Sequence, residues 1–194
     1  MRPMAPDRPP LTRIIEEELI DYRIRSWFSH PQYVRTLGLA GDEQILEFGS
    51  GGGCLSRALS AAIRPDGSLT CVDISPYWIA KAQARLKRFS NIGFRQGDAR
   101  RMDLPAGHYD AVVIHYALHD VDPAERDDVL SALATALRPE GTLFIREPAT
   151  PGHGISLVEI RTLTRDAGLR ELHAGCIRSW LGKQICDGVF RKNW

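Results

Sequence analysis

Short apolar runs alternate with amphipathic segments along most of the chain. The runs lack the regular polar alternation of a strand that has one face in water, so they predict strands buried on both faces. A segment with helical periodicity follows each of them, and this alternating order predicts an α/β fold, with a parallel sheet covered by helices on both faces. We expect these strands at residues 44–48, 68–73, 91–98, 109–116 and 142–147.

Turn and capping residues mark where the intervening helices begin and end. Ser75 and Pro76 open a helix that runs to residue 89, because serine is a preferred cap and proline a preferred first-turn residue. Asp122-Pro123 starts another helix, which we expect residues 138–141 to close. Further helices are predicted at residues 54–63 and 157–167.

The chain ends in two strand-like segments, residues 169–176 and 184–192, with no helical segment between them. A parallel crossover needs about a dozen residues and usually a helix. The last two strands are therefore predicted to be antiparallel.

The N-terminal part of the chain differs from the rest. We divide the chain into a disordered tail, a helical cap and one main domain at residues 1–10, 11–40 and 41–194. Residues 11–28 carry apolar side chains at roughly helical spacing, which predicts an amphipathic helix that His30-Pro31 interrupts. That helix either packs on the sheet, forms a dimer contact or touches a membrane surface, and the acidic triplet at residues 16–18 opposes the last of these.

Charge and composition exclude several classes of protein. With 25 basic and 24 acidic residues, the chain has no overall field that attracts nucleic acid or an anionic membrane. No apolar run approaches the ~18 residues that span a bilayer, and the first residues lack the apolar core of a signal peptide, so we expect a cytoplasmic protein without a membrane span. The four cysteines lack metal-site spacing, and we expect reduced thiols.

Residues 45–59 read ILEFGSGGGCLSRAL, a strand that ends in glycines before a helix. The spacing is Gly49-x-Gly51-x-Gly53, and Cys54 stands where a dinucleotide fingerprint has glycine or alanine. A P-loop is excluded because no Gly-Lys-Ser/Thr follows. Asp73 ends the second strand 20 residues after Gly53, as expected of a carboxylate that binds ribose hydroxyls. The loop therefore predicts a ribose-containing ligand without a pyrophosphate.

Five motifs, in this order, resemble those of the class I S-adenosylmethionine-dependent methyltransferases. They are LEFGSGGG, VDIS, QGDA, YDAVVIHYALHDV and LRPEGTLFIREP, and the resemblance covers about residues 44–192. It implies a Rossmann-like three-layer sandwich with a seven-stranded, mostly parallel sheet of strand order 3-2-1-4-5-7-6, whose last strand is antiparallel. It also implies S-adenosyl-L-methionine as the cofactor and S-adenosyl-L-homocysteine as the product.

The resemblance gives each residue of the cofactor site a role. Glu47 and the loop backbone would contact the methionine moiety, Asp73 the ribose hydroxyls and Ile74 the adenine. Asp98 and the Ala99 amide would bind polar atoms of the adenine. The full predicted set is Glu47, Gly49, Ser50, Gly51, Gly53, Asp73, Ile74, Asp98, Ala99 and His115. The alternatives are an ordinary tight turn for the glycines, a helix cap for Asp73 and an Asx turn for Asp98.

The segment HYALHD after the fourth strand carries the candidate catalytic groups. Methyl transfer from a sulfonium depends largely on orientation, and a base is needed only if the nucleophile arrives protonated. Because an imidazole can take up a proton near neutral pH, His119 is the first candidate base and His115 the second. The alternatives are that His115 only forms a hydrogen bond in the pocket wall and that His119 pairs with Asp120 or caps the loop. A metal site at His115, His119 and Asp120 is disfavoured because no other ligands converge in the sequence.

The candidate substrate-pocket residues are Tyr22, Trp27, Tyr116 and Glu147. Family members that methylate exocyclic amines of nucleic-acid bases usually carry a Pro-Pro-aromatic motif after the fourth strand, where this chain has residues 115–117, His-Tyr-Ala. We therefore expect a small-molecule acceptor and no nucleic acid, with O, N or C as acceptor atom and a monomer or homodimer. The alternatives are a protein or peptide methyltransferase, an NAD(P)-dependent oxidoreductase and a cofactor-binding protein without catalysis.

Overall fold

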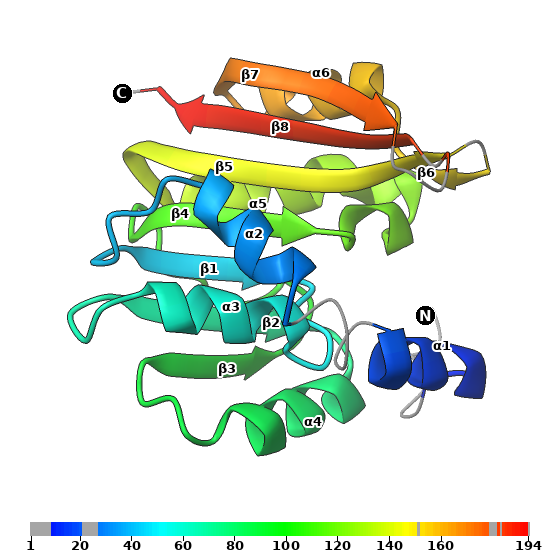
Figure 1. Ribbon diagram of the computed structural model, residues 1–194. Coiled ribbons are helices and arrows are strands. Elements are labelled where there is room, and N and C mark those ends of the chain that lie inside the picture. Colours follow the sequence, from blue (N-terminus) through cyan, green and yellow to red (C-terminus); the bar gives the residue numbers. More distant parts are fainter. Residues whose placement is uncertain (1–8, 21–26, 151, 179–181, 183, 194) are drawn as a thin grey trace. The chain divides into compact units, whose positions relative to one another are not determined.

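The computed structural model describes residues 9–20, 27–150, 152–178, 182 and 184–193 (Figure 1). The chain divides into two compact units, residues 1–98 and residues 99–194, called the first and the second unit from here on. Each unit contains its own set of hydrogen-bonded strands and its own buried apolar side chains.

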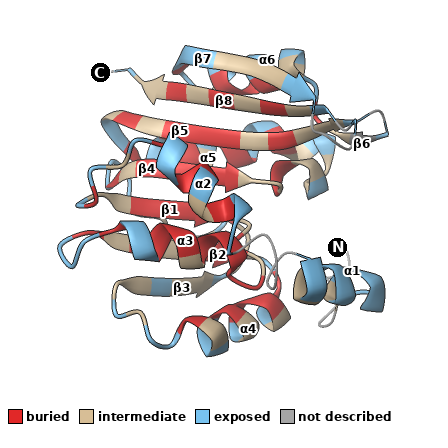
Figure 2. Ribbon diagram, viewed as in Figure 1, coloured by how far each residue is buried: buried red, intermediate tan, exposed pale blue. Residues whose placement is uncertain are grey.

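The first unit contains three parallel strands in the order β3-β2-β1. They are β1 (Gln44–Phe48), β2 (Ser68–Asp73) and β3 (Ile92–Gln96), each within two residues of its predicted bounds. Ile45 and Leu46 of β1 and Leu69 of β2 are fully buried, so these apolar runs lie in the core (Figure 2). Helix α3 (Cys54–Ala62) contacts β2, and α4 (Pro76–Leu86) contacts β2 and β3.

Local residues explain where these two helices begin. Gly53 precedes α3 with a φ of 83°, a left-handed conformation that glycine adopts without steric cost. Ser75 caps α4, because its hydroxyl accepts a hydrogen bond from the backbone N of Trp78 at 3.5 Å. Pro76 is the first residue of α4, as predicted.

The first helix of the N-terminal cap is shorter than the prediction over residues 11–28. Helix α1 (Leu11–Glu16) continues as a π-helical turn through residues 17–20, and the next six residues lie outside the described part of the chain. No residue of α1 is buried, and Leu11 and Ile15 are largely exposed. The apolar side chains that predicted packing therefore do not lie in a core.

The second helix of the cap, α2 (Ser29–Thr36), contacts α3. It includes Pro31 in its first turn, so the predicted interruption at His30-Pro31 is wrong. Proline fits this position because the amides of a first helical turn have no intrahelical partner in any case.

The second unit contains four strands in the order β4-β5-β8-β7. They are β4 (Tyr109–His115), β5 (Leu137–Thr150), β7 (Leu169–Arg178) and β8 (Gln184–Lys192). Strands β4 and β5 are parallel, whereas β8 is antiparallel to both β5 and β7, which confirms the predicted antiparallel pair. A two-residue strand, β6 (His153–Gly154), pairs with the end of β5, so β7 and β8 are the sixth and seventh strands of the predicted order.

The remaining helices lie where the pattern predicted them. Helix α5 (Arg126–Ala136) contacts β5, and α6 (Leu157–Asp166) contacts α5 and β7. Two 3-10 turns, η2 (Leu118–Asp120) and η3 (Pro123–Glu125), connect β4 to α5. Among the described residues, no helix has both the length and the apolar character needed to cross a membrane.

The loop predicted at residues 138–141 is wrong, because these residues belong to β5, which begins directly after α5. The start of this strand is irregular: the pairing shifts register between Tyr109 and Ala111, and Glu140 has a φ of 61°. An irregular strand start accommodates the proline and glycine that suggested a turn in the sequence.

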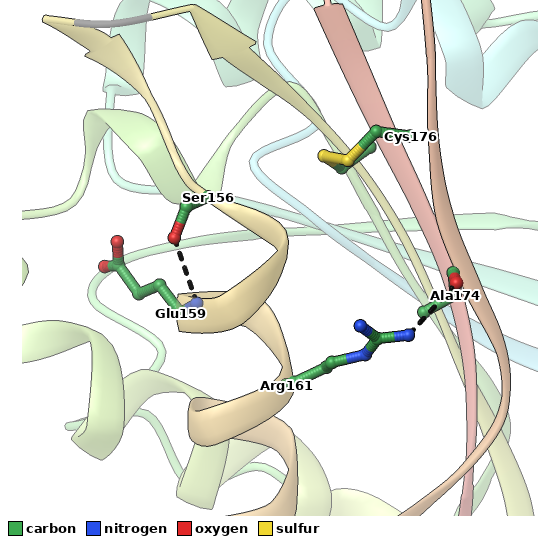
Figure 3. Close-up of a disulfide and its surroundings, with 6 residues drawn as sticks. Ser156, Glu159, Arg161, Ala174 and Cys176 are labelled. Carbon is green, nitrogen blue, oxygen red and sulfur yellow. Dashed lines mark hydrogen bonds between the residues drawn. A yellow bond between two sulfur atoms is a disulfide. The ribbon is translucent and has the colours of Figure 1, made fainter.

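Cys176 and Cys186 form a disulfide between the neighbouring strands β7 and β8 (Figure 3). The two residues lie opposite each other in the antiparallel register. The prediction of four reduced thiols is therefore wrong for this pair, because the pairing follows from strand register, which the spacing of cysteines does not reveal. In the same region Arg161 of α6 donates to the backbone oxygen of Ala174 at 3.3 Å and ties α6 to β7.

Replacement of Gly53 by alanine tests how tightly the start of α3 packs. The new Cβ would lie 3.2 Å from Ala82 Cβ and 2.7 Å from Leu86 Cδ1, both on α4, and the positive φ would add strain. We expect Gly53→Ala to lower the free energy of unfolding by about 2–4 kcal/mol in urea denaturation, the sum of a left-handed alanine and overpacking.

The matched control is Gly107→Ala, since Gly107 has a φ of 64° and open space around the added Cβ. It should lose only the conformational part, about 1–2 kcal/mol. Equal losses in the two variants would show that the contact with α4 does not restrict residue 53.

Candidate functional site

The glycine loop, residues 49–53, lies where β1 ends and α3 begins. Gly49, Gly51 and Gly53 have φ values of 70°, 52° and 83°, which L side chains rarely adopt. The amides of Gly49 and Ser50 donate to the backbone oxygen of Val72 in β2, at 2.8 and 3.0 Å. The loop is thus fixed to the neighbouring strand, and the turn depends on glycine at three positions.

Asp73, at the end of β2, holds the next part of the loop. One carboxylate oxygen accepts a hydrogen bond from the Gly51 amide at 2.8 Å, and the other accepts from the Ser75 amide at 2.8 Å. The next residue, Ile74, exposes 53% of its surface. The structure therefore places Gly51, Asp73 and Ile74 together at the carboxyl end of two parallel strands.

Glu47 lies on β1 and is buried. Its carboxyl group accepts a hydrogen bond from the Ser56 hydroxyl at 2.5 Å and from the Cys71 thiol at 3.6 Å. The pKa of Glu47 is raised to about 8, mainly by burial; the hydrogen bonds from Ser56 and Cys71 oppose this rise, and the charges of Asp73 and Glu17 add to it.

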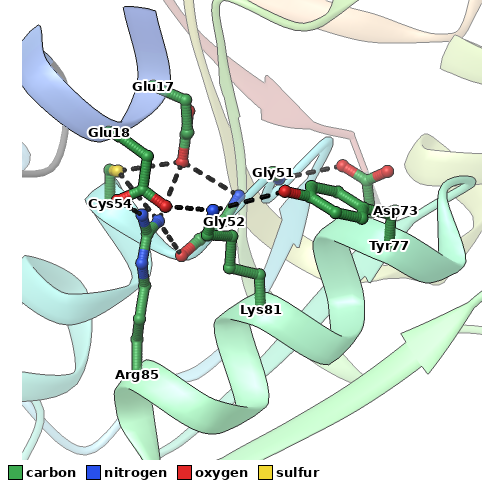
Figure 4. Close-up of polar contacts among 9 residues, drawn as sticks. All are labelled: Glu17, Glu18, Gly51, Gly52, Cys54, Asp73, Tyr77, Lys81 and Arg85. Carbon is green, nitrogen blue, oxygen red and sulfur yellow. Dashed lines mark hydrogen bonds and ion pairs between the residues drawn. The ribbon is translucent and has the colours of Figure 1, made fainter. Parts of the chain in front are cut away.

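A carboxylate from the N-terminal segment reaches the same loop (Figure 4). Glu17 accepts a hydrogen bond from the Gly52 amide at 3.1 Å and forms an ion pair with Arg85 of α4 at 3.2 Å. The sequence did not predict this contact, because the acidic triplet at residues 16–18 is indistinguishable from a solvated run of charge, and Arg85 lies 68 positions further along the chain.

Two predicted adenine contacts lie at the boundary between the units. Asp98 is the last residue of the first unit and is half-buried, and Ala99 is the first residue of the second unit and is buried. Their roles stay predictions.

In the second unit, Glu147 near the end of β5 is fully buried. One of its carboxylate oxygens accepts hydrogen bonds from the amides of Ala117 and Leu118, at 2.9 and 2.7 Å. The other lies 2.6 Å from Nδ1 of His119. Glu147 thus holds the segment after β4, a contact that the sequence did not predict, and its role toward a substrate stays a prediction.

His119 exposes only 8% of its side chain, and its second ring nitrogen lies 3.7 Å from a carboxylate oxygen of Asp120. The backbone around it is also fixed, because the buried Arg126 donates to the backbone oxygens of His119 and Val121 at 3.2 and 3.1 Å. The imidazole therefore has a carboxylate oxygen near each ring nitrogen, that of Glu147 at 2.6 Å from Nδ1 and that of Asp120 at 3.7 Å from Nε2.

His115 and Tyr116 follow each other at the end of β4, with ring centroids 4.6 Å apart and planes at 84°. Tyr116 has a φ of 55°, and its amide donates to the backbone oxygen of Arg146 at 2.8 Å. A positive φ in a bulky residue is a strained conformation, and such strain is concentrated at functional sites.

The aromatic residues predicted to line a substrate pocket are only partly described. Tyr22 lies outside the described residues, and Trp27 is 58% exposed with its ring 3.5 Å below the Arg57 guanidinium carbon. Within the described ranges, no group of three or more histidine, cysteine or carboxylate side chains could hold a metal ion.

Comparison with known proteins identifies a matching family and several relatives. Residues 45–141 match the family described as a methyltransferase domain. A ubiquinone/menaquinone biosynthesis C-methyltransferase UbiE from Ectopseudomonas mendocina (strain ymp) is 28% identical over 119 residues, which are 60% of this chain and 46% of that protein. The UbiE of Pseudomonas aeruginosa (strain LESB58) is 27% identical over 121 residues, with 61% and 46% covered. The chain thus spans about half the length of these curated relatives.

Solved structures show the fold. A SAM-dependent methyltransferase from Aquifex aeolicus has a TM-score of 0.78 at 18% identity, with 95% of this chain and 99% of that chain covered. The N-methyltransferase NodS from Bradyrhizobium japonicum WM9, in complex with S-adenosyl-L-homocysteine, has a TM-score of 0.73 at 21% identity, with 93% and 97% covered. The predicted class, a Rossmann-like, mostly parallel sheet of order 3-2-1-4-5-7-6, is confirmed.

Replacement of Glu47 by glutamine tests the raised pKa of its carboxyl group. Between the ordinary value near 4.5 and the folded value of about 8, the folded chain keeps a proton that the unfolded chain releases. The stability that this group contributes is therefore complete at low pH and is lost as pH rises toward 8. We expect the unfolding free energy of the wild type, relative to Glu47→Gln, to fall by up to ~1.4 kcal/mol per pH unit between pH 5 and 8.

Urea denaturation at several pH values measures this difference. The exposed Glu16→Gln removes the same kind of group and should keep the pH dependence of the wild type. A Glu47→Gln protein with the unchanged slope would contradict the assignment of a protonated, buried Glu47.

Proposed function

This chain belongs to the methyltransferase domain family, and from that premise we propose that it binds S-adenosyl-L-methionine and transfers the methyl group to a small molecule, releasing S-adenosyl-L-homocysteine. The observation that carries the proposal is the arrangement of Gly51, Asp73 and Ile74 at the carboxyl end of β1 and β2. In open α/β sheets, ligands bind at this edge.

Asp73 fits the ribose of this cofactor. Each oxygen of the carboxylate accepts one backbone amide, from Gly51 or Ser75. A carboxylate oxygen has two lone-pair sites, so it can accept a ribose hydroxyl in addition to a backbone amide. The exposed apolar surface of Ile74 beside it suits an adenine ring.

The loop and Glu47 fit the amino-acid end of the cofactor. Ser50 is buried, and its hydroxyl has no hydrogen-bond partner among the residues that the structure describes, as expected where a ligand supplies one. A cation next to Glu47 would favour the ionised carboxylate, so this buried group suits an ammonium. With S-adenosylmethionine bound, the sulfonium supplies the activated methyl group.

A nicotinamide cofactor fits the same loop less well. Its fingerprint has glycine or alanine where this chain has Cys54, and Cys54 is buried in contact with Glu17. A negative pyrophosphate at this loop would also meet the carboxylate of Asp73.

The class of acceptor is the least determined part of the proposal. The relatives named UbiE are C-methyltransferases and NodS is an N-methyltransferase, which supports a small molecule but leaves O, N and C open. The absence of nucleic acid among the partners, a monomer or homodimer and a cytoplasmic location stay predictions from sequence.

His119 is the proposed base for an acceptor that arrives protonated, and His115 the second candidate. If Nδ1 carries the proton that it shares with Glu147 at 2.6 Å, Nε2 of His119, 3.7 Å from the Asp120 carboxylate, is the nitrogen that would take the acceptor proton. Glu147 is then a positioning residue, which fixes the tautomer and the segment that carries the imidazole. With S-adenosylmethionine bound, the acceptor would supply the electron pair for an in-line displacement at the methyl carbon, and the thioether S-adenosylhomocysteine would be the leaving group.

Thermal unfolding with added ligands tests the cofactor. S-adenosylmethionine or S-adenosylhomocysteine at about 100 times its dissociation constant should raise the midpoint by ~5–10 °C, since such binding adds ~2.7 kcal/mol of stability. Asp73→Asn should reduce this ligand-induced rise, whereas Asp66→Asn, an exposed aspartate, should keep it. A rise with reduced nicotinamide cofactors alone would overturn the proposal and favour an oxidoreductase. A rise with the sulfur ligands, without turnover of any acceptor, would favour a binding protein.

Replacement of His119 by alanine tests the base. Once a panel of hydroxyl, amine and quinol compounds has given an acceptor with a protonated nucleophile, His119→Ala should lower kcat by ~10²–10⁴-fold. The ligand-induced rise in melting temperature should stay unchanged, and the exposed His108→Ala should behave as the wild type in both measurements. An unchanged kcat in His119→Ala would move the assignment to His115 or to no base at all.

A further inference from the structure

The N-terminal segment, residues 11–20, is attached to the glycine loop through two carboxylates (Figure 4). The carboxylate of Glu17 accepts hydrogen bonds from the Gly52 amide at 3.1 Å, the Cys54 thiol at 3.1 Å and the Arg85 guanidinium at 3.2 Å. Glu18 pairs with Lys81 and, at 2.8 Å, with the second terminal nitrogen of Arg85.

Of the apolar side chains of this segment, only that of Ile14 is half-buried. No residue of α1 is buried, and the apolar side chains of residues 11, 15, 19 and 20 are all exposed. The segment is attached to the loop through the charge pairs of Glu17 and Glu18, and the Glu17–Arg85 pair is mostly buried, with 16% and 9% of the two side chains exposed. Removing one partner of such a pair is costly, whereas a ligand anion in the place of Glu17 would keep Arg85 paired.

Gly52 shows that the loop is shaped to receive a carboxylate. Unlike its neighbours Gly51 and Gly53, Gly52 does not have a positive φ, so its backbone does not need glycine. A Cβ at this position would meet Arg85 Nη1 and a carboxylate oxygen of Glu17, the ends of two flexible side chains that would both have to shift. The missing side chain lets the Gly52 amide and Arg85 converge on one anionic group.

Arg85 is built into this position. Its side chain exposes only 9% of its surface, and Nη1 also donates to the backbone oxygen of Gly52 at 2.9 Å. The guanidinium thus stays next to the loop whether or not Glu17 is present. Without the segment, the Gly52 amide, Arg85 and Lys81 would form a cationic seat for a ligand anion.

Glu17 also brings a third acidic group to a loop that already has Glu47 and Asp73. The charge of Glu17, like that of Asp73, raises the pKa of Glu47 and so disfavours the ionised form of its carboxyl group. A ligand whose own carboxylate replaced that of Glu17 would keep the charge balance with Arg85 and would bring its ammonium toward the acidic groups.

We propose that Glu17 occupies the seat of the carboxylate at the amino-acid end of the cofactor, so that the N-terminal segment is a self-bound plug that leaves the loop when the cofactor binds. The inference rests on the proposed function, because it takes an S-adenosyl amino acid as the ligand. It makes residues 11–20 a competitor for the site, in contrast to a lid that closes over a bound ligand.

Two variants of Glu17 measure the competition. Glu17→Gln removes the charge and keeps the shape, and Glu17→Ala removes the acceptor as well. If the plug is in place nine-tenths of the time, its release tightens the apparent affinity by about tenfold, since the apparent dissociation constant is the intrinsic one divided by the competent fraction. Glu16→Gln makes the same charge change at an exposed neighbouring position and should leave the affinity unchanged.

The choice of ligand separates the seat from the rest of the site. S-adenosylhomocysteine carries the carboxylate, whereas 5′-methylthioadenosine has the same nucleoside and lacks the amino-acid end. Calorimetry should show tighter binding of S-adenosylhomocysteine to both Glu17 variants, up to about tenfold, and unchanged binding of 5′-methylthioadenosine.

Hydrogen exchange of the amides of residues 11–20 gives a second readout that does not depend on turnover. Exchange should be faster in both Glu17 variants than in the wild type and Glu16→Gln, and in the wild type it should become faster when S-adenosylhomocysteine is added. Slower exchange on adding that ligand, or weaker binding of it by the Glu17 variants, would overturn the plug and indicate a lid.

The same measurements distinguish failure of the inference from failure of the proposed function. Binding of both ligands with equal responses to Glu17→Gln would overturn the plug and leave the methyltransferase proposal intact. If neither ligand binds to any variant, the proposed function is overturned and the inference with it.

Discussion

The hydrogen bond from the Gly51 amide to the Asp73 carboxylate is the contact on which the candidate cofactor site depends. It joins the loop after β1 to the end of β2. The same contact therefore fixes both the conformation of the loop and the orientation of the Asp73 carboxylate. This hydrogen bond requires a positive φ at Gly51. The hydrogen bonds from the amides of Gly49 and Ser50 to the backbone oxygen of Val72 attach the same loop to β2. Parallel pairing of the two strands brings these groups to one edge.

This arrangement concentrates negative charge, and the surrounding residues respond to it. Burial keeps the pKa of Glu47 near 8, so the innermost acid carries a proton at neutral pH and avoids a third full charge beside Asp73 and Glu17. Arg85 of α4 offsets the negative charge of the outer acids, and Lys81 forms an ion pair with Glu18, so that cations face these acids. Because the most buried acid is neutral and the outer acids are paired with cations, the site suits the zwitterionic amino-acid end of the proposed cofactor.

The strands and the cofactor loop were predictable because their signals are local. An apolar run such as residues 109–116 or a glycine spacing such as residues 49–53 reports its own structure. The disulfide, the Glu17–Arg85 pair and the contacts of Glu147 were not predictable, because each joins residues whose proximity depends on strand register or on separations of up to 68 positions. The predictions at Pro31 and at residues 138–141 were wrong although their signals are local. Proline is also accepted in a first helical turn, and proline and glycine are accepted at an irregular strand start.

Glu147 and all of its described partners lie within the second unit, whereas the contacts of Asp73 and the glycine loop lie within the first. One buried carboxylate holds the segment after β4, because it contacts two backbone amides and an imidazole of that segment. A hydrogen bond from a backbone amide does not depend on the type of side chain at that residue. Ala117 and Leu118 are themselves buried, so this segment is fixed both by its side chains and by its amides. Loss of the single carboxylate of Glu147 would therefore leave two buried amides and one imidazole without their partner at the same time.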